Sequence, residues 1–325
     1  MANYLVTGAA GFIASKVCDL LLEEGHSVVG LDNLNDAYDV RLKEYRLKRL
    51  AARPNFLFRK QDITDRDALQ DVFKAHGSFS AVFNLAAWAG VRASVENPWA
   101  FVDTNLSGTL NLLDACRQYG IPKFILASTS SVYGANAPQP TPEEAVSSAP
   151  LQPYSASKKA AEVMCHAYHY LYGLDVSIFR YFTVYGPAGR PDMVMFRFTQ
   201  WIYEGRPVRL NGDGTQSRGF TYLDDIARGT VAGLKPVGYE IMNLGGHEPI
   251  TINEMIARLE ELIGRKAMVE YHPFHKADML SNLADVSKAC RVLGWGPQVN
   301  LEQGMRRLVE WYQAERSWAS QVSTE

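Results

Sequence analysis

Short apolar runs alternate with amphipathic, helix-like segments along the first 180 residues. The runs predict strands at residues 3–6, 27–31, 56–58, 81–85, 124–127 and 176–179. The segments between them predict helices at residues 15–24, 41–52, from 64 onwards, 98–119 and 154–172. Continuous apolar strands that alternate with helices are typical of a parallel sheet covered on both faces. The pattern therefore predicts an α/β fold with a doubly wound parallel sheet.

The pattern becomes less regular after residue 180, where proline and glycine gather at 186–191. Thr251 and Glu254 have the spacing of a capping box, which marks the start of a helix. Helices are expected at 251–263, 285–293 and 301–314, and a tight turn at 211–214. We interpret this part as a smaller mixed α/β C-terminal lobe packed against the sheet. The predicted domains are 1–179 together with 223–248, and 180–222 together with 249–325.

Composition narrows the class of protein. The 325 residues carry 33 Lys+Arg against 35 Asp+Glu, a formal net charge of −2, and 47% of them are hydrophobic. This near-neutral balance argues against nucleic acid or an anionic membrane as the main partner. The chain shows neither an apolar run of about 18 residues nor a signal-peptide pattern. Its four cysteines are widely spaced, which is typical of reduced thiols in a cytoplasmic protein.

A glycine-rich turn follows the first predicted strand. Gly8 and Gly11 stand between this strand and the first helix, and Asp32 ends the second strand, 21 residues beyond Gly11. Glycines let the backbone approach a pyrophosphate at a helix N-terminus, and the carboxylate binds the adenosine ribose and repels a 2′-phosphate. The motif predicts a Rossmann domain that binds NAD rather than NADP, with Ala14 in place of a third glycine. Phe12, Ile13 and Asn33 are expected to contact the same cofactor.

Asp62 and Ile63 follow the third predicted strand. This position flanks the adenine in a Rossmann domain, so both residues are candidate cofactor contacts. The alternative interpretation is that Asp62 only begins the next helix.

Tyr154 and Lys158 are four residues apart and share one face of a predicted helix. An ammonium about 5 Å from a phenol lowers its pKa by roughly two units, which makes Tyr154 a feasible base near neutral pH. Lys158 can also hold the nicotinamide ribose, and Thr129, just past the fifth strand, can share a hydrogen bond with the substrate hydroxyl. A hydroxyl base beside NAD predicts hydride transfer on a secondary alcohol.

These motifs resemble the extended short-chain dehydrogenase/reductase family of nucleotide-sugar enzymes over almost the whole chain. The resemblance rests on the glycine turn, on Asn84 to Ala87, on the serine-rich strand end before Val132-Tyr133-Gly134, and on Tyr154 with Lys158. It adds Leu85, Ala86 and Ala87 to the expected cofactor contacts. Within the family, the UDP-glucuronate 4-epimerases are most similar, through the stretches 33–42, 89–98 and 181–193.

The resemblance implies C4 epimerisation of a UDP-sugar, UDP-glucuronate to UDP-galacturonate, through a 4-keto intermediate. Dehydratases and decarboxylases of the family carry acidic residues where this chain has Ser130 and Ser131. The alternatives are a UDP-glucose or other UDP-hexose 4-epimerase, a UDP-glucuronate decarboxylase, and an NAD-binding sensor without turnover. Tyr154, Thr129 and Lys158 argue against the sensor.

Arg190 is the candidate holder of the sugar carboxylate, helped by Ser130; alternatively it is a loop arginine paired with Asp192. Arg218 matches the family arginine that binds the diphosphate, although Gly219 stands where the family usually has an aspartate. The remaining expected substrate contacts are Arg92, Thr183 and Asp278. A second phosphate-binding cation is expected near His275, and Trp88 and Ala93 depart from the epimerase pattern on the sugar side.

The resemblance also implies a homodimer that pairs the helices 98–119 and 154–172. Two histidine groups, His166 with His169 and His272 with His275 and Asp278, have metal-like spacing. We interpret both as surface or interface residues and predict no metal, because hydride transfer to NAD needs none. The charged run 41–53 is interpreted as a solvated helix face.

Overall fold

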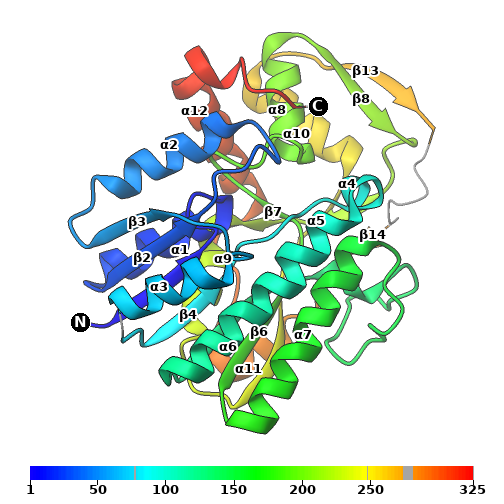
Figure 1. Ribbon diagram of the computed structural model, residues 1–325. Helices are drawn as coiled ribbons and strands as arrows, with labels where there is room; N and C mark the ends of the chain where they lie inside the picture. Colours follow the sequence, from blue (N-terminus) through cyan, green and yellow to red (C-terminus); the bar gives the residue numbers. More distant parts are fainter. Residues whose placement is uncertain (77, 247, 274–280, 325) are drawn as a thin grey trace.

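The computed structural model describes residues 1–76, 78–246, 248–273 and 281–324 (Figure 1). Its centre is a seven-stranded sheet with the order β11-β6-β5-β4-β1-β2-β3, and every neighbouring pair is parallel. The strands are β1 (Asn3–Thr7), β2 (Ser27–Asp32), β3 (Phe56–Lys60), β4 (Ala81–Asn84), β5 (Lys123–Thr129), β6 (Asp175–Tyr181) and β11 (Tyr239–Leu244). The strand order reverses at β1, which is where doubly wound sheets bind their ligands.

Helices cover both faces of this sheet. One face packs on α1 (Phe12–Glu23), α2 (Val40–Ala51), α9 (Leu223–Ala232) and α11 (Ser287–Leu293). The other packs on α3 (Arg66–His76), α6 (Thr109–Tyr119) and α7 (Pro153–Tyr172). Each face has its own buried apolar cluster, so the strands are apolar on both sides. The predicted doubly wound α/β fold is confirmed.

Two predicted helices differ from those observed. The segment 98–119 is divided into α5 (Pro98–Val102), a π-helical turn η1 (Asp103–Gly108) and α6. Single π-turns inside helices often occur at functional sites. The helix expected from Thr64 begins two residues later, because the Thr64 hydroxyl donates to Asp62 and the Asp65 carboxylate accepts from the N–H of Ala68.

The second lobe contains α8 (Val194–Glu204), α10 (Ile252–Ile263) and α12 (Leu301–Ala319) around a third apolar cluster. Its short strands are β7 (Val184–Tyr185), β8 (Pro207–Asn211), β9 (Ser217–Gly219), β10 (Thr221–Tyr222), β12 (Pro249–Thr251), β13 (Met268–His272) and β14 (Ser281–Asn282). The predicted capping box is confirmed, since the Thr251 hydroxyl accepts from the N–H of Glu254 and Glu254 accepts from the N–H of Thr251. The pattern after residue 180 did not predict α8 or the short strands, and α12 extends five residues beyond the expected end.

The chain crosses between the two parts more than once. After β7 to β10 it returns to the central sheet, where α9 packs on α1 and β11 pairs with β6. The exact domain boundaries remain a prediction.

The interpretation of residues 41–53 as a solvated face is wrong for two cations. Lys43 and Arg46 are buried on α2, on the same side as Leu42 and Leu50. Lys43 lines the pocket described below, and the Arg46 guanidinium donates to the Ala10 carbonyl rather than to solvent.

The C-terminal residues run back over α2. The N–H of Ser323 donates to the Asp39 carboxylate at 3.0 Å, and Val322 packs with Leu42 and Phe196 in a small apolar cluster. Gln200 on α8 donates to the carbonyls of Ala319 and Val322. These contacts tie α2 to the second lobe.

Candidate active site

A pocket lies at the carboxyl ends of the parallel strands, beside the β1–β4 switch point. Every predicted cofactor contact lines it: Gly8, Gly11, Phe12, Ile13, Asp32, Asn33, Asp62, Ile63, Leu85, Ala86, Ala87, Tyr154 and Lys158. Arg190 lines the same pocket. The structure thus brings fourteen candidate residues from distant parts of the chain to one place. Among the described residues, five further candidates do not line this pocket: Thr129, Ser130, Arg92, Thr183 and Arg218.

The two glycines of the turn lie so close to other backbone atoms that neither position has room for a side chain. A Cβ at Gly8, which has a φ of +69°, would lie 2.9 Å from the backbone of Ala86, and one at Gly11 would lie 2.7 Å from the Gly8 carbonyl oxygen. Gly11 is also the N-cap of α1, where it has no side chain with which to occupy the helix N-terminus. The first N–H groups of α1 are therefore available to an anionic group in the pocket.

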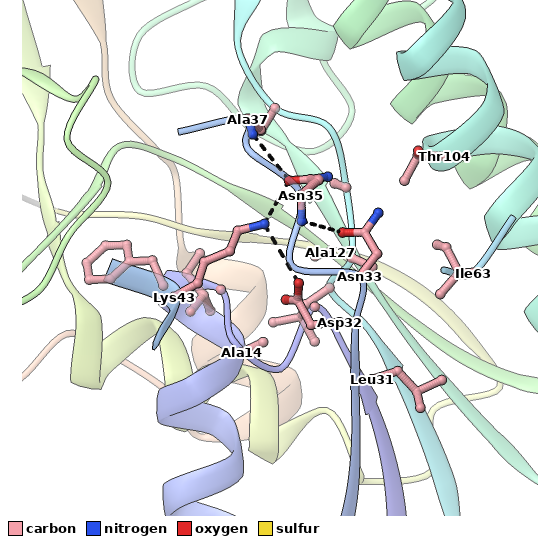
Figure 2. A pocket seen from close by; sticks show the side chains of 18 of the residues that line it. Ala14, Leu31, Asp32, Asn33, Asn35, Ala37, Lys43, Ile63, Thr104 and Ala127 are labelled. Atoms are coloured by element: carbon pink, nitrogen blue, oxygen red, sulfur yellow. Dashed lines mark hydrogen bonds and ion pairs between the residues drawn. The ribbon is translucent and has the colours of Figure 1, made fainter. Parts of the chain in front are cut away.

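Asp32 ends β2 with both carboxylate oxygens in use. They accept from the N–H groups of Ala10 at 3.2 Å and Leu34 at 2.8 Å. The Lys43 ammonium lies 3.7 Å from Asp32 and donates to the Asn35 side chain at 2.7 Å (Figure 2). The ribose end of the predicted site therefore carries a buried carboxylate–ammonium pair, and the sequence had indicated only the carboxylate.

Asp62 fits both interpretations of its position. It accepts from the N–H of Thr64 at 2.8 Å, as a carboxylate before a helix does, and from the Asn33 amide at 2.7 Å while it lines the pocket. Burial raises its pKa, but these hydrogen bonds outweigh that effect and hold the pKa below the ordinary value. Ile63 packs against Gly108 of the π-helical turn, where a Cβ would lie 2.6 Å from its side chain.

Tyr154 lines the pocket and is hydrogen-bonded to Thr129, which lies outside the lining. Burial raises the pKa of Tyr154, and the Thr129 hydrogen bond and the charge of Arg190 offset only part of this effect. The expected depression of the Tyr154 pKa by Lys158 is therefore wrong for the chain's own residues, because desolvation dominates. The Lys158 ammonium instead donates to the Ala127 carbonyl at 2.9 Å, and burial lowers its pKa to about 8.

Glu162 lies one turn beyond Lys158 on α7. Its carboxylate accepts from Arg180 on β6 at 2.7 Å and from Ser128 on β5 at 2.6 Å. The helix that carries Tyr154 is thus bonded to the two strands whose ends form the pocket floor. This contact was not predicted from the sequence.

Arg190 pairs with Asp192, as the alternative interpretation expected, and it also lines the pocket. Its guanidinium donates to both oxygens of Asp192, at 3.0 and 2.7 Å, and to the Ala89 carbonyl at 3.0 Å. It lies 5.8 Å from the centre of the Tyr38 ring, and its charge acts on Tyr154. The arginine is therefore held beside the candidate base by an acid in its own loop.

The other substrate candidates lie on the second-lobe side. Asn282 on β14 donates to the Ser130 hydroxyl at 3.2 Å and is the register partner of Arg218 on β9, so Ser130 and Arg218 share a neighbour. Thr183 precedes β7, and Arg92 is exposed on α4 (Val91–Glu96). The candidates Asp278 and His275 lie outside the described residues.

Several residues that line the pocket were not named as expected contacts, although Ala14 belongs to the predicted glycine motif: Ala14, Leu31, Asn35, Ala37, Tyr38, Lys43, Gln61, Ala89, Thr104, Ala127, Ser128 and Tyr181. Lys43 had a detectable signal, since it directly follows Leu42 and lies on the side of α2 that Leu50 marks as buried. Tyr38 and Asn35 lie in the stretch 33–42 that resembles the UDP-glucuronate 4-epimerases, but they belong to an irregular loop whose periodicity does not predict where their side chains lie.

The predicted histidine pair on α7 packs against an aromatic ring. His166 lies edge-on to Tyr239 at 5.1 Å, and His169 contacts the same ring and the Leu174 carbonyl. Among the described residues, no group of three or more His, Cys, Asp or Glu side chains could hold a metal ion. His272 lies on β13, and its two partners in the second group lie outside the described residues.

Comparison with known proteins agrees with this geometry. Residues 4–245 match the NAD dependent epimerase/dehydratase family. The chain is 57% identical over 312 residues, 96% of both chains, to a UDP-glucuronate 4-epimerase of Thermodesulfobacterium geofontis. The chain belongs to the NAD dependent epimerase/dehydratase family. The resemblance noted in the sequence is confirmed.

Solved structures of the epimerase/dehydratase family share the whole fold. A UDP-glucuronic acid 4-epimerase from Bacillus cereus, in complex with UDP-glucuronic acid and NAD, is similar with a TM-score of 0.91 and 36% identity, covering 96% of this chain and 99% of that one. A UDP-glucose 4-epimerase from Thermotoga maritima, with UDP-glucose, gives 0.90 and 35%, covering 97% and 99%. Two substrates are thus bound on nearly the same fold, and discrimination between them must come from individual residues.

Proposed function

We propose that this protein is an NAD-dependent UDP-glucuronate 4-epimerase, which interconverts UDP-glucuronate and UDP-galacturonate through a 4-keto intermediate. The observation that carries the proposal is the placement of Arg190 beside the Tyr154–Thr129 pair, in a chain that is 57% identical to a UDP-glucuronate 4-epimerase over nearly its full length. A UDP-sugar with an uncharged sugar, such as UDP-glucose, has no C6 carboxylate for this cation to bind.

The residues of the pocket fit NAD. The open N-terminus of α1 at Gly11 suits the pyrophosphate, Asp32 suits the adenosine ribose, and Asp62 with Ile63 suits the adenine. Asp32 also disfavours the 2′-phosphate of NADP, although the neighbouring Lys43 reduces that effect. When bound, NAD⁺ would supply the acceptor for the hydride of the sugar C4 and, once reduced, the donor for its return to the opposite face.

Tyr154 is the residue that takes the proton of the C4 hydroxyl. Its own pKa is raised by burial, so the phenolate depends on neighbours that favour negative charge: the Thr129 hydrogen bond and Arg190. Lys158 stands one turn away with a lowered pKa and holds the nicotinamide ribose. Once the 4-keto sugar has rotated to present its other face, Tyr154 returns the proton to the C4 oxygen while hydride returns to C4, and C4 is inverted.

Arg190 supplies the specificity for a uronate. A 4-keto uronate is a β-keto acid, which loses CO₂ when the breaking bond overlaps the carbonyl. A guanidinium that holds the carboxylate, helped by Ser130, keeps it out of that geometry, and an arginine–carboxylate pair contributes about 1.5–3 kcal/mol. The substrate carboxylate competes with Asp192 for the same donors, which makes Asp192 a tuning residue for this contact.

The second lobe binds the UDP moiety. Arg218 is proposed to contact the diphosphate from β9, next to Asn282 and Ser130. Thr183, Arg92 and Asp278 are proposed as further substrate contacts.

We also propose that the protein works as a homodimer in the cytoplasm. Large apolar side chains are exposed along α5 and α7, which belong to the segments 98–119 and 154–172 that the family resemblance assigns to dimer formation: Trp99, Val102, Val163, Tyr170, Leu171 and Tyr172. A second copy of the chain would remove this surface from water. Among the described residues, no helix has the length and apolarity needed to span a bilayer.

The deciding experiment supplies NAD⁺ and either UDP-glucuronate or UDP-glucose, and follows the sugars by proton NMR. We expect UDP-galacturonate in the first reaction and no UDP-galactose in the second. UDP-galactose formation would favour the second candidate, a UDP-hexose 4-epimerase, whose support is the similarity to the Thermotoga maritima enzyme. UDP-xylose would instead mean a decarboxylase despite Ser130 and Ser131.

Two variants test the role of Arg190 in the same assay. Arg190→Ala should lower kcat/KM for UDP-glucuronate by about 10- to 100-fold, the range of an arginine–carboxylate pair. Asp192→Asn removes the competing acid and should keep or lower the KM for UDP-glucuronate. Equal losses in both variants would assign Arg190 to the folding of its loop rather than to substrate binding.

A further inference from the structure

Arg46 is a buried cation that bonds to two separate loops of the active site. From α2, its guanidinium donates to the Ala10 carbonyl at 3.1 Å and to the Ala188 carbonyl at 3.0 and 2.6 Å. A weaker contact of 3.3 Å reaches the Gly189 carbonyl, and the Tyr38 hydroxyl accepts at 2.8 Å. Only 4% of the arginine is exposed.

These acceptors are neutral, which is unusual for a buried charge. A cation that is removed from water needs its donors satisfied, and three carbonyls and one phenol do this here. The rings of Phe12 and Tyr38 add cation–π contacts at 5.8 and 5.6 Å. A planar guanidinium can bridge acceptors in two loops at once, whereas the ammonium of a lysine is a single point.

Both loops belong to the proposed catalytic machinery. Ala10 directly precedes Gly11, the N-cap of α1, and Phe12 lines the cofactor pocket. Ala188 and Gly189 directly precede Arg190. Ala188 has a φ of +52°, a left-handed conformation that is costly for a residue with a Cβ, so this turn needs support from its surroundings.

Tyr38 connects the two arginines. Its ring centre lies 5.6 Å from the Arg46 guanidinium and 5.8 Å from the Arg190 guanidinium. The ring lines the pocket, and its hydroxyl is bonded to Arg46. A change in the position of Arg46 therefore reaches Arg190 through the Ala188 turn and through the Tyr38 ring.

We propose that Arg46 is a positioning residue that holds the glycine turn and the loop of Arg190 in fixed positions relative to each other. In this way it links cofactor binding to recognition of the sugar carboxylate. The part that concerns the carboxylate rests on the proposed function. Arg46 touches neither substrate nor cofactor in this assignment; it acts through Ala10, Ala188 and Tyr38.

The test uses Arg46→Lys, which keeps the charge and the apolar stem but cannot span both loops. Lys48→Met is the matched control, because Lys48 is exposed on the same helix. Affinities are measured by calorimetry in a Tyr154→Phe background, where the substrate is not turned over. We expect Arg46→Lys to weaken NAD⁺ binding at least 3-fold and UDP-glucuronate binding at least 5-fold, with no change in the control.

A double-mutant cycle separates positioning from general folding support. If Arg46 acts through Arg190, Arg46→Lys should change UDP-glucuronate affinity less than 2-fold once Arg190→Ala is present. Equal weakening with and without Arg190, or a lower Tm with both affinities intact, would overturn the proposal. The NAD⁺ measurement does not involve the sugar, so unaltered NAD⁺ binding refutes the link even if wild-type protein fails to epimerise UDP-glucuronate. That failure by itself refutes only the proposed function.

Discussion

Glu162 and Arg180 form a buried ion pair that joins the helix of Tyr154 to the central sheet. The Arg180 guanidinium donates to both oxygens of Glu162, at 2.9 and 2.7 Å, and each residue is 1% exposed. The Tyr133 ring lies 4.7 Å from the guanidinium, and Ser128 donates to the carboxylate. The pair stands directly behind the pocket floor, so it supports the catalytic geometry without contact with the substrate.

Removal of one member of this ion pair should strongly lower the free energy of unfolding. Glu162→Gln leaves the Arg180 charge buried without its counter-ion, and we expect a loss of about 3–5 kcal/mol in the free energy of unfolding. Urea denaturation measures this. Glu302→Gln breaks the exposed pair with Arg306 and should cost at most about 0.5 kcal/mol. Similar losses in the two variants would show that the buried pair contributes no more than a surface one.

Lys158 should make stability depend on pH in a specific direction. Its pKa is about 8 in the folded chain against 10.5 ordinarily, so between pH 8 and 10.5 the unfolded chain holds a proton that the folded chain has released. Stability from this group therefore rises with pH in that window. Relative to Lys158→Met, wild type should gain at most about 3 kcal/mol from pH 7.5 to 10.5. Urea titrations of both proteins without cofactor measure the difference, and a flat difference would contradict the assignment.

Tyr154→Phe should abolish turnover and spare cofactor binding. The substitution removes only the hydroxyl that takes the C4 proton, and we expect kcat to fall by more than about 10³-fold with a Kd for NAD⁺ within 3-fold of wild type. Proton NMR of quenched reactions measures kcat, and calorimetry measures the Kd for NAD⁺. Tyr271→Phe, at an exposed tyrosine on β13 outside the pocket and the proposed dimer surface, serves as the control and should keep full activity. Substantial turnover in Tyr154→Phe would mean that another group is the base.

The exposed apolar side chains of α5 and α7 should be needed for assembly. Trp99→Glu and Val163→Glu introduce a charge that a partner surface would have to desolvate, and each should raise the dimer dissociation constant by at least 10-fold. Sedimentation velocity at several concentrations measures it. Val146→Glu alters a valine that is more exposed than Val163 and lies in a loop outside these helices, and it should leave assembly unchanged. A wild-type protein that sediments as a monomer at all concentrations would refute the homodimer.

The sequence predicted the parts of the fold that depend on local order. The run 124–127 is apolar throughout and the run 176–179 is apolar apart from Ser177, as expected for strands buried on both faces of a parallel sheet. Gly8 and Gly11 were placed correctly because the turn and the helix N-terminus follow each other in the sequence. Asp32 was placed correctly beside them because β1 and β2 are adjacent parallel strands whose carboxyl ends lie at the same edge of the sheet. The short strands β9 and β14 were missed because each consists of two or three residues whose pairing is set by distant parts of the chain.

The errors at the site have a common physical origin. Tyr154 and Lys158 were correctly placed on one helix face, but their pKa values depend on burial, which spacing does not reveal. Lys43 and Arg46 were assigned to solvent because charged residues rarely lie inside a protein. They are buried because Asp32 and the carbonyls of two loops receive their charges, and those acceptors come from other parts of the chain.

The late arrival of β11 has a consequence for synthesis of the chain. β6 is complete at Tyr181, but the strand that pairs with its outer edge begins only at Tyr239. A nascent chain on the ribosome therefore presents a buried-type strand with an unpaired edge until nearly sixty further residues have been added. Such an edge is a template for association between chains. Fragments that end before Tyr239 should aggregate, and expression of the complete chain should benefit from slow synthesis or chaperone capacity.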